Sequence, residues 1–151
     1  MWKINLNFCA LIIRNKNKFI ELTIERYQFG YRIDNDEFDN NWLVVHLKVD
    51  NGNDFWEKSD AALLQWEAEG LNSFLKNKKP GKINFIEPNL SFSLNIGNDR
   101  KFILSVILAQ EYLPSSVPIS DQYKIEFELT DNEIDEIVRC YKEELSNYPK
   151  R

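Results

Sequence analysis

The sequence is poor in the residues from which most catalytic sites are built. It holds one histidine and two cysteines in 151 residues. Histidine is the side chain most used for proton transfer near neutral pH, so a proton relay would have to recruit His46. His46 lies within an apolar stretch that is typical of a strand, where a packed or hydrogen-bonded structural role is favoured over a catalytic one. No G-x-S-x-G motif accompanies it, and the sequence predicts no enzyme.

Metal and cofactor motifs are equally scarce. Cys9 and Cys140 lie at opposite ends of the sequence, so neither a disulfide framework nor a zinc-ligand spacing can be built from them. We expect both to be free thiols. The five glycines are scattered singly, whereas phosphate-binding loops need several at fixed spacing before a helix. The sequence therefore predicts no cofactor and no metal.

Long hydrophobic runs are also lacking. The apolar run near the start, residues 8–13, has six residues and is followed by Arg14, Lys16 and Lys18. It is too short to cross a membrane and has no small-residue cleavage site of a signal peptide. A chain of this length with 43% hydrophobic residues can bury one core, and we expect a cytoplasmic protein.

Negative charge is concentrated in two parts of the chain. Net charge is −5, but residues 33–60 hold eight acidic residues against two lysines, and residues 121–146 hold nine against three basic ones. Such regions repel phosphates, which makes nucleic acid and anionic membrane poor ligands for them. The distribution favours a basic protein partner.

Two-residue alternation of apolar and polar side chains predicts strands along most of the chain. The predicted strands cover residues 19–29, 42–49, 90–96, 102–108 and 123–129, with a return strand beginning at Phe55. Asn51-Gly52 and Gly97-Asn98-Asp99 are turn sequences that join neighbouring strands. These short links favour antiparallel pairing, because a parallel crossover needs a dozen or more residues.

Two amphipathic helices are predicted, over residues about 60–77 and 131–147. Ser59 or Asp60 can cap the first, and Thr130 with Glu133 forms a capping box for the second. The expected fold class is α+β, a mainly antiparallel twisted sheet of about six or seven strands with both helices packed on it. We expect one domain over residues 19–147, a C-terminal tail at 148–151, and an N-terminal extension at 1–18 that is either an extra strand or read from an upstream start.

The acid-rich stretch at residues 34–39 is the most distinctive feature of the surface. A calcium loop fits poorly, since Phe38 occupies a ligand position and Asp39 stands where glycine is required. A hydrolase with paired carboxylates, a calcium- or ligand-binding module and a merely solvated loop stay open as alternatives. Acids beside aromatic residues also suit a protein interface. The candidate partner-binding residues are Asp34, Asp36, Glu37, Phe38, Asp39 and Trp56.

The segment 21–78 resembles the WapI-type family of bacterial immunity proteins. Tyr27-Gln28-Phe29 ends a strand, and an Asp-rich loop then leads to Asn41-Trp42-Leu43. The further matching residues are an aromatic residue before Asp60, then Leu63-Leu64-Gln65-Trp66-Glu67, Leu71, Phe74 and Leu75. The similarity continues more weakly, so that it covers about residues 19–146. Gly30 stands where proline is expected and Asn40 where a small residue is common, so the backbone of the loop is expected to differ.

The resemblance implies a non-enzymatic antitoxin that binds and blocks the C-terminal domain of a contact-dependent or secreted polymorphic toxin. Toxins of this kind are often nucleases, and a nuclease must present basic groups to phosphates. An acidic loop can occupy that basic surface instead. Because Asp39 and Trp42 belong to the shared motif, we expect them to serve the fold. The predicted contacts therefore rest most on Asp34, Asp36 and Glu37.

Overall fold

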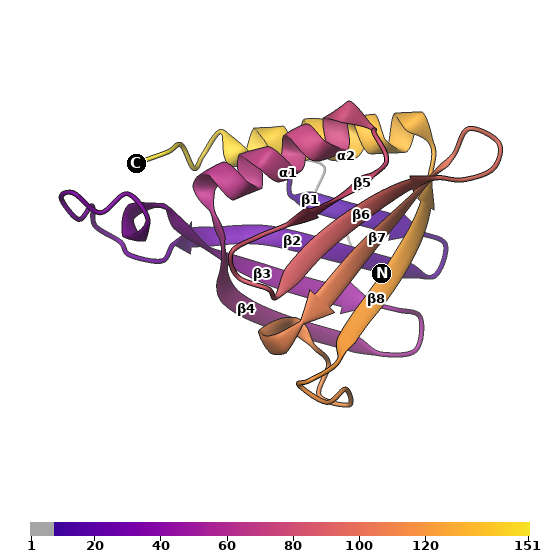
Figure 1. Cartoon of the computed structure of the whole chain (residues 1–151), viewed down its shortest axis with the longest axis horizontal. Coiled ribbons are helices and arrows are strands. Elements are labelled where there is room, and N and C mark those ends of the chain that lie inside the picture. The colour runs from indigo at the N-terminus through magenta and orange to yellow at the C-terminus, as the bar shows by residue number, and fades with distance from the viewer. Residues whose placement is uncertain (1–7) are drawn as a thin grey trace.

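The computed structural model describes residues 8–151, which form eight strands and two helices (Figure 1). The first sheet contains β1 (Leu11–Asn15), β2 (Lys18–Tyr27), β3 (Trp42–Asp50) and β4 (Phe55–Leu64). The second contains β5 (Gly81–Asn84), β6 (Leu90–Ile96), β7 (Phe102–Ala109) and β8 (Gln122–Leu129). Helix α1 (Gln65–Asn77) connects the two sheets, and helix α2 (Asp131–Leu145) follows the second.

Both sheets are antiparallel meanders in which each strand pairs with its neighbour along the chain. The predicted α+β class is confirmed. The strands are slightly more numerous than the six or seven expected, and they are divided between two four-stranded sheets. This division follows from α1, which carries the chain from β4 to β5 without pairing these two strands.

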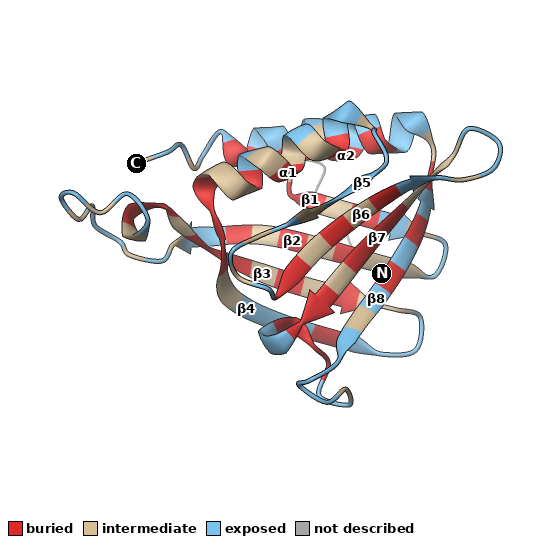
Figure 2. Ribbon diagram, viewed as in Figure 1, coloured by how far each residue is buried: buried red, intermediate tan, exposed pale blue. Residues whose placement is uncertain are grey.

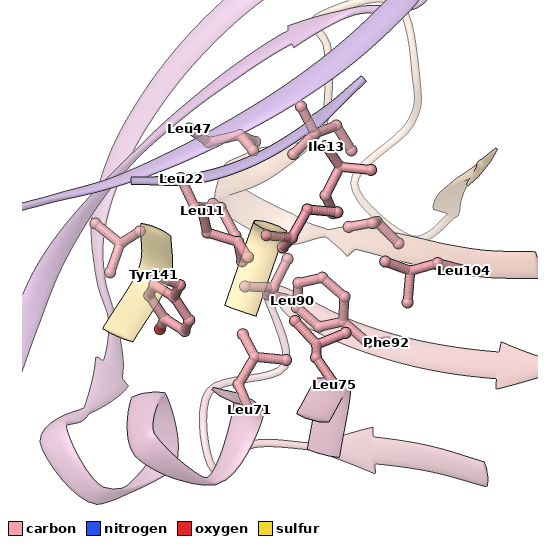
Figure 3. Close-up of a cluster of buried hydrophobic side chains, with 14 of the residues drawn as sticks. Leu11, Ile13, Leu22, Leu47, Leu71, Leu75, Leu90, Phe92, Leu104 and Tyr141 are labelled. Carbon is pink, nitrogen blue, oxygen red and sulfur yellow. The ribbon is translucent and has the colours of Figure 1, made fainter. Parts of the chain in front are cut away.

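The core lies between the two sheets and beneath the helices, which run side by side along one edge of the sheet pair (Figures 1 and 2). Alternate residues of the strands point inward, as the period of two requires. The fully buried members include Leu11, Ile13, Ile20, Leu47, Phe92, Leu94, Leu104, Val106 and Phe127. Leu71 and Leu75 of α1 and Tyr141 of α2 point into the same cluster (Figure 3). Burying each such side chain stabilises the fold by about 1.5–3 kcal/mol before entropy is counted.

Helix α1 begins at Gln65, five residues later than the pattern predicted. Residues 60–64 instead continue β4, where Leu64 pairs with Trp42 at the end of the ladder. Asp60, one of the two predicted caps, accepts a hydrogen bond from the side chain of Asn89. The first turn is closed by Glu67, whose Oε1 accepts from the backbone N–H of Leu64 at 3.0 Å.

The predicted capping box of α2 is confirmed. The backbone N–H of Glu133 donates to Thr130 Oγ1 at 3.2 Å, and the backbone N–H of Thr130 donates to Glu133 Oε1 at 3.1 Å. The helix starts at Asp131 as predicted and ends at Leu145, two residues before the predicted end. Its apolar face packs on α1 and β1.

Part of the expected N-terminal extension lies within the sheet. Leu11–Asn15 form the edge strand β1, which pairs with β2, and Leu11 and Ile13 are fully buried. Residues 1–7 of that extension lie outside the described residues. Over residues 8–151, neither helix has the length and apolar character needed to cross a membrane.

Candidate partner-binding surface

The acidic stretch forms part of a loop that projects from one end of the molecule. Residues 28–41, here named the acidic loop, connect β2 to β3 and extend beyond the sheets at the left of Figure 1. The loop is held by its own side chains. The backbone N–H of Ile33 donates to Asn40 Oδ1, and Asn40 Nδ2 donates to the carbonyl of Ile33, both at 2.5 Å. This pair of hydrogen bonds closes the loop across seven residues.

The acids of this loop divide into two kinds. Asp36 Oδ1 accepts from the backbone N–H of Asp39 at 2.9 Å, which supports the 3-10 turn at Asp39–Asn41. Partial desolvation, with Asp36 close by, raises the pKa of Asp39 above its ordinary value. Asp34 and Glu37, by contrast, are exposed. Of the four candidate acids, these two present their carboxylates most fully to solvent, while Asp36 and Asp39 support the loop.

The residues after α2 clasp the base of the acidic loop. Asn41 Nδ2 donates to the carbonyl of Arg151 at 2.9 Å, and the backbone N–H of Arg151 donates to Asn41 Oδ1 at 2.8 Å. The Arg151 guanidinium lies 4.4 Å from the ring centre of Tyr27 and donates to the carbonyl of Phe29 at 3.1 Å. We name residues 148–151 the C-terminal clasp. The segment expected to be a C-terminal tail therefore helps to fix the loop.

An aromatic and basic contact joins the loop to α1. Phe38, which is 50% exposed, lies edge-on against Trp66 with ring centres 5.4 Å apart. Lys150 Nζ lies 5.3 Å from the centre of the Trp66 ring and 2.6 Å from Glu37 Oε1. The sequence predicts Trp66 within the first helix, and no local sequence pattern indicates its position beside the acidic loop.

Trp56, a candidate contact residue, lies elsewhere. Its side chain is 8% exposed, and its Nε1–H donates to the backbone carbonyl of Tyr112 at 3.0 Å. Its ring also meets Tyr123 edge-on, with centres 5.4 Å apart. Trp56 thus packs β4 against the second sheet and offers little surface to a partner. The exposed aromatic residues of the acidic loop are Phe38 and Tyr31, the latter 68% exposed.

His46 belongs to a polar cluster on the outer face of the first sheet. Its Nδ1 lies 2.7 Å from Ser59 Oγ and 3.3 Å from Glu25 Oε1, while Nε2 faces Glu57 at 3.8 Å. Ser59 Oγ donates to Glu25 at 2.8 Å. A serine relay needs the hydroxyl and the carboxylate on opposite ring nitrogens. Here the Ser59 hydroxyl donates to Glu25 instead of to the imidazole, and Glu57 lies beyond hydrogen-bonding distance of Nε2, so this arrangement suits a structural hydrogen-bond network.

The other chemical alternatives have little geometric support. Among residues 8–151, no group of three or more histidine, cysteine or acidic side chains is placed to hold a metal ion. Cys9 and Cys140 are free thiols, as expected. The thiol of Cys9 donates to Glu143 Oε2 at 3.2 Å, and its contacts with Cys140 and Glu143 raise its pKa to about 12. The protonated form of such a thiol is a weak nucleophile.

Comparison with known proteins agrees with the sequence resemblance. Neither the curated proteins nor the solved structures contain a match to the chain. The sequence model of the immunity protein WapI-like family, however, matches residues 11–149, a span that runs from β1 into the C-terminal clasp. The match covers nearly all of the described fold, and the chain therefore belongs to the immunity protein WapI-like family.

Proposed function

We propose that this protein neutralises a cognate toxin domain by binding it with the acidic loop, without catalysis of its own. Membership in an immunity-protein family supports a toxin-neutralising role. The observation that carries the choice of surface is the exposure of Asp34, Glu37 and Phe38 together on one projecting loop. Carboxylates steer a basic partner toward the loop, and an aromatic side chain supplies area that can be buried at contact.

The fixed shape of the loop favours tight binding. The Asn40 and Asn41 hydrogen bonds and the C-terminal clasp hold its backbone before any partner arrives. A preorganised loop loses less conformational entropy on association than a mobile one. The carboxylates of the loop then bind the basic surface of the partner in the place of the phosphates of its nucleic acid.

The proposed partner is the C-terminal domain of a secreted or contact-dependent toxin, acting in the cytoplasm where the immunity protein resides. A nuclease domain fits best, because its phosphate-binding surface is basic. Occlusion of that surface would block access of nucleic acid. The gene next to this one is the place to look for the toxin, as a large secreted protein with a variable C-terminal domain.

Charge reversal of the two exposed acids tests the proposal. The variant Asp34→Lys/Glu37→Lys should bind the purified toxin domain at least ~10-fold more weakly, with slower association and a flatter dependence on salt. Binding is measured by surface plasmon resonance at several salt concentrations, and protection by growth of cells that co-express the toxin. Circular dichroism checks that the variant is folded.

Glu126→Lys/Glu128→Lys is the matched control. It makes the same change in net charge on β8, at exposed positions of the second sheet. It should keep most of the affinity, since long-range steering alone is screened over about 8 Å at physiological salt. Equal losses in the two variants would show that only net charge matters and would overturn the assignment of the loop.

A further inference from the structure

A cationic side chain of the protein itself already occupies a cradle on the proposed surface. The ammonium of Lys150 lies 2.6 Å from the carboxylate of Glu37 and 5.3 Å from the ring centre of Trp66. Phe38 stands edge-on against the same indole, at 5.4 Å between ring centres. We name Glu37, Phe38 and Trp66 the cation cradle.

These three side chains match the chemistry that recognises lysine and arginine. The face of an indole is negative and attracts a cation within about 6 Å of the ring centre. A carboxylate at hydrogen-bonding distance adds a charge-assisted bond to the same cation. Phe38 packs against the same indole in a T-shaped contact, with the two ring planes at 82°, while the ammonium of Lys150 lies over the indole ring. The cradle is therefore built for one basic side chain.

Lys150 is held less firmly than its neighbour in the clasp. Its side chain is 55% exposed and that of Glu37 is 60% exposed, so solvent screens the ion pair. Arg151, in contrast, is anchored through its backbone to Asn41 and through its guanidinium to the carbonyl of Phe29. Lys150 can therefore swing out of the cradle while the clasp stays in place.

We propose that the cation cradle receives a lysine or arginine side chain of the partner, and that Lys150 occupies this place in the free protein. The inference rests on the proposed function, since it names what the partner presents to the acidic loop. On association, the partner's cation replaces Lys150 between Glu37 and Trp66. Lys150 thus competes with the partner, and its removal leaves the cradle open.

A small-molecule probe tests the cradle without any toxin. Nα-acetyl-lysine methylamide is titrated into ¹⁵N-labelled Lys150→Ala protein, and the indole N–H signal of Trp66 is followed by NMR. We expect a saturable shift at millimolar probe and several-fold weaker binding to the wild-type protein. The uncharged analogue Nα-acetyl-norleucine methylamide should give no shift. Equal affinity of wild type and Lys150→Ala for the lysine probe would overturn the inference.

Two variants show that the probe sits in the cradle. Trp66→Leu keeps an apolar side chain at this half-buried position but removes the indole face. It should abolish the chemical-shift change that the probe causes at the backbone N–H of the neighbouring Phe38. Lys142→Ala removes an exposed lysine of α2 and should behave like wild type. A probe response that survives in Trp66→Leu would place the binding elsewhere and overturn the inference.

Binding to the purified toxin domain is the second test of the cradle. Lys150→Ala should bind it several-fold more tightly than Lys142→Ala, which makes the same charge change outside the cradle. Equal or weaker binding by Lys150→Ala would overturn the cradle while leaving the acidic loop as the binding surface. The proposed function itself fails only if Asp34→Lys/Glu37→Lys binds the toxin domain as well as the control Glu126→Lys/Glu128→Lys does. The two failures are therefore distinct.

Discussion

Glu144 of α2 is a buried carboxylic acid whose position explains its unusual protonation. It is 6% exposed, and its Oε2 accepts from the backbone N–H of Ile24 at 3.1 Å, beside the irregularity of β2 between Ile24 and Arg26. Within residues 8–151, Oε1 has no hydrogen-bond partner. Burial raises the pKa from 4.5 to about 8, the bond from Ile24 opposes that rise, and the charge of Glu21 adds to it. The side chain supplies an acceptor that the irregular strand needs.

The raised pKa predicts that stability falls with rising pH. The folded state favours the protonated form of Glu144, so its contribution is complete below about pH 4.5 and is lost as pH rises through about 8. Glu144→Gln keeps an acceptor and does not titrate. Relative to this variant, wild type should lose up to about 1.4 kcal/mol of unfolding free energy per pH unit within that window. Urea unfolding between pH 5 and 9 measures the difference, and Glu128→Gln on β8 should follow wild type. Parallel curves for wild type and Glu144→Gln would refute the assignment.

Helix α2 is the element whose local sequence and structure agree most closely. Thr130 and Glu133 satisfy two of the first-turn N–H groups that have no partner inside a helix. The helix also carries Ile134 and Tyr141, which are buried against the rest of the core. The helix as a whole packs on β1 and α1.

Loss of the cap should weaken the whole domain through this helix. Thr130→Ala removes the side-chain acceptor for the N–H of Glu133 and should lower the free energy of unfolding by about 1 kcal/mol. Thr130→Ser retains the hydroxyl and should stay within a few tenths of a kcal/mol of wild type. Chemical denaturation monitored by circular dichroism compares the three proteins. Equal losses for alanine and serine would show that the methyl group, and not the cap, matters.

The whole molecule is one core shared by both sheets and both helices. Strand β1 contacts β2, α2 and β8, so it joins all the layers although it lies at the edge of its sheet. Leu11 and Ile13 carry this role and are fully buried. The first sheet is therefore not expected to unfold separately from the second.

Truncation of β1 side chains tests this cooperativity. Leu11→Ala should cost about 2–5 kcal/mol, because a buried cavity is left behind. Tryptophan fluorescence and circular dichroism should still give one coincident transition. Ile12→Ala, on the half-buried opposite side of the strand, should cost clearly less. Two separate transitions in Leu11→Ala would show that the sheets are independent.

Local signals predicted what depends on near neighbours along the chain. The Asn51-Gly52 turn is one example: Gly52 has φ of 93°, and Asn51 Oδ1 accepts from the backbone N–H groups of Asn53 and Asp54. The sequence predicts too early a start for α1 because Asp60 has the chemistry of a helix cap. Only pairing with β3 and the bond from Asn89 keep this residue in β4. Tertiary pairing here overrides a local preference.

Sequence alone determined the class of fold, six of the eight strands with their turns, and the cap of α2, because these depend on periodicity and on hydrogen bonds within a few residues. Its motifs also carried the family resemblance. Only the tertiary structure decided that Trp56 is a core residue, that residues 148–151 clasp the acidic loop, and that Lys150 meets Glu37 and Trp66. These contacts join residues from about 50 to more than 100 positions apart, so no local pattern encodes them. The packing of the whole chain brings them together.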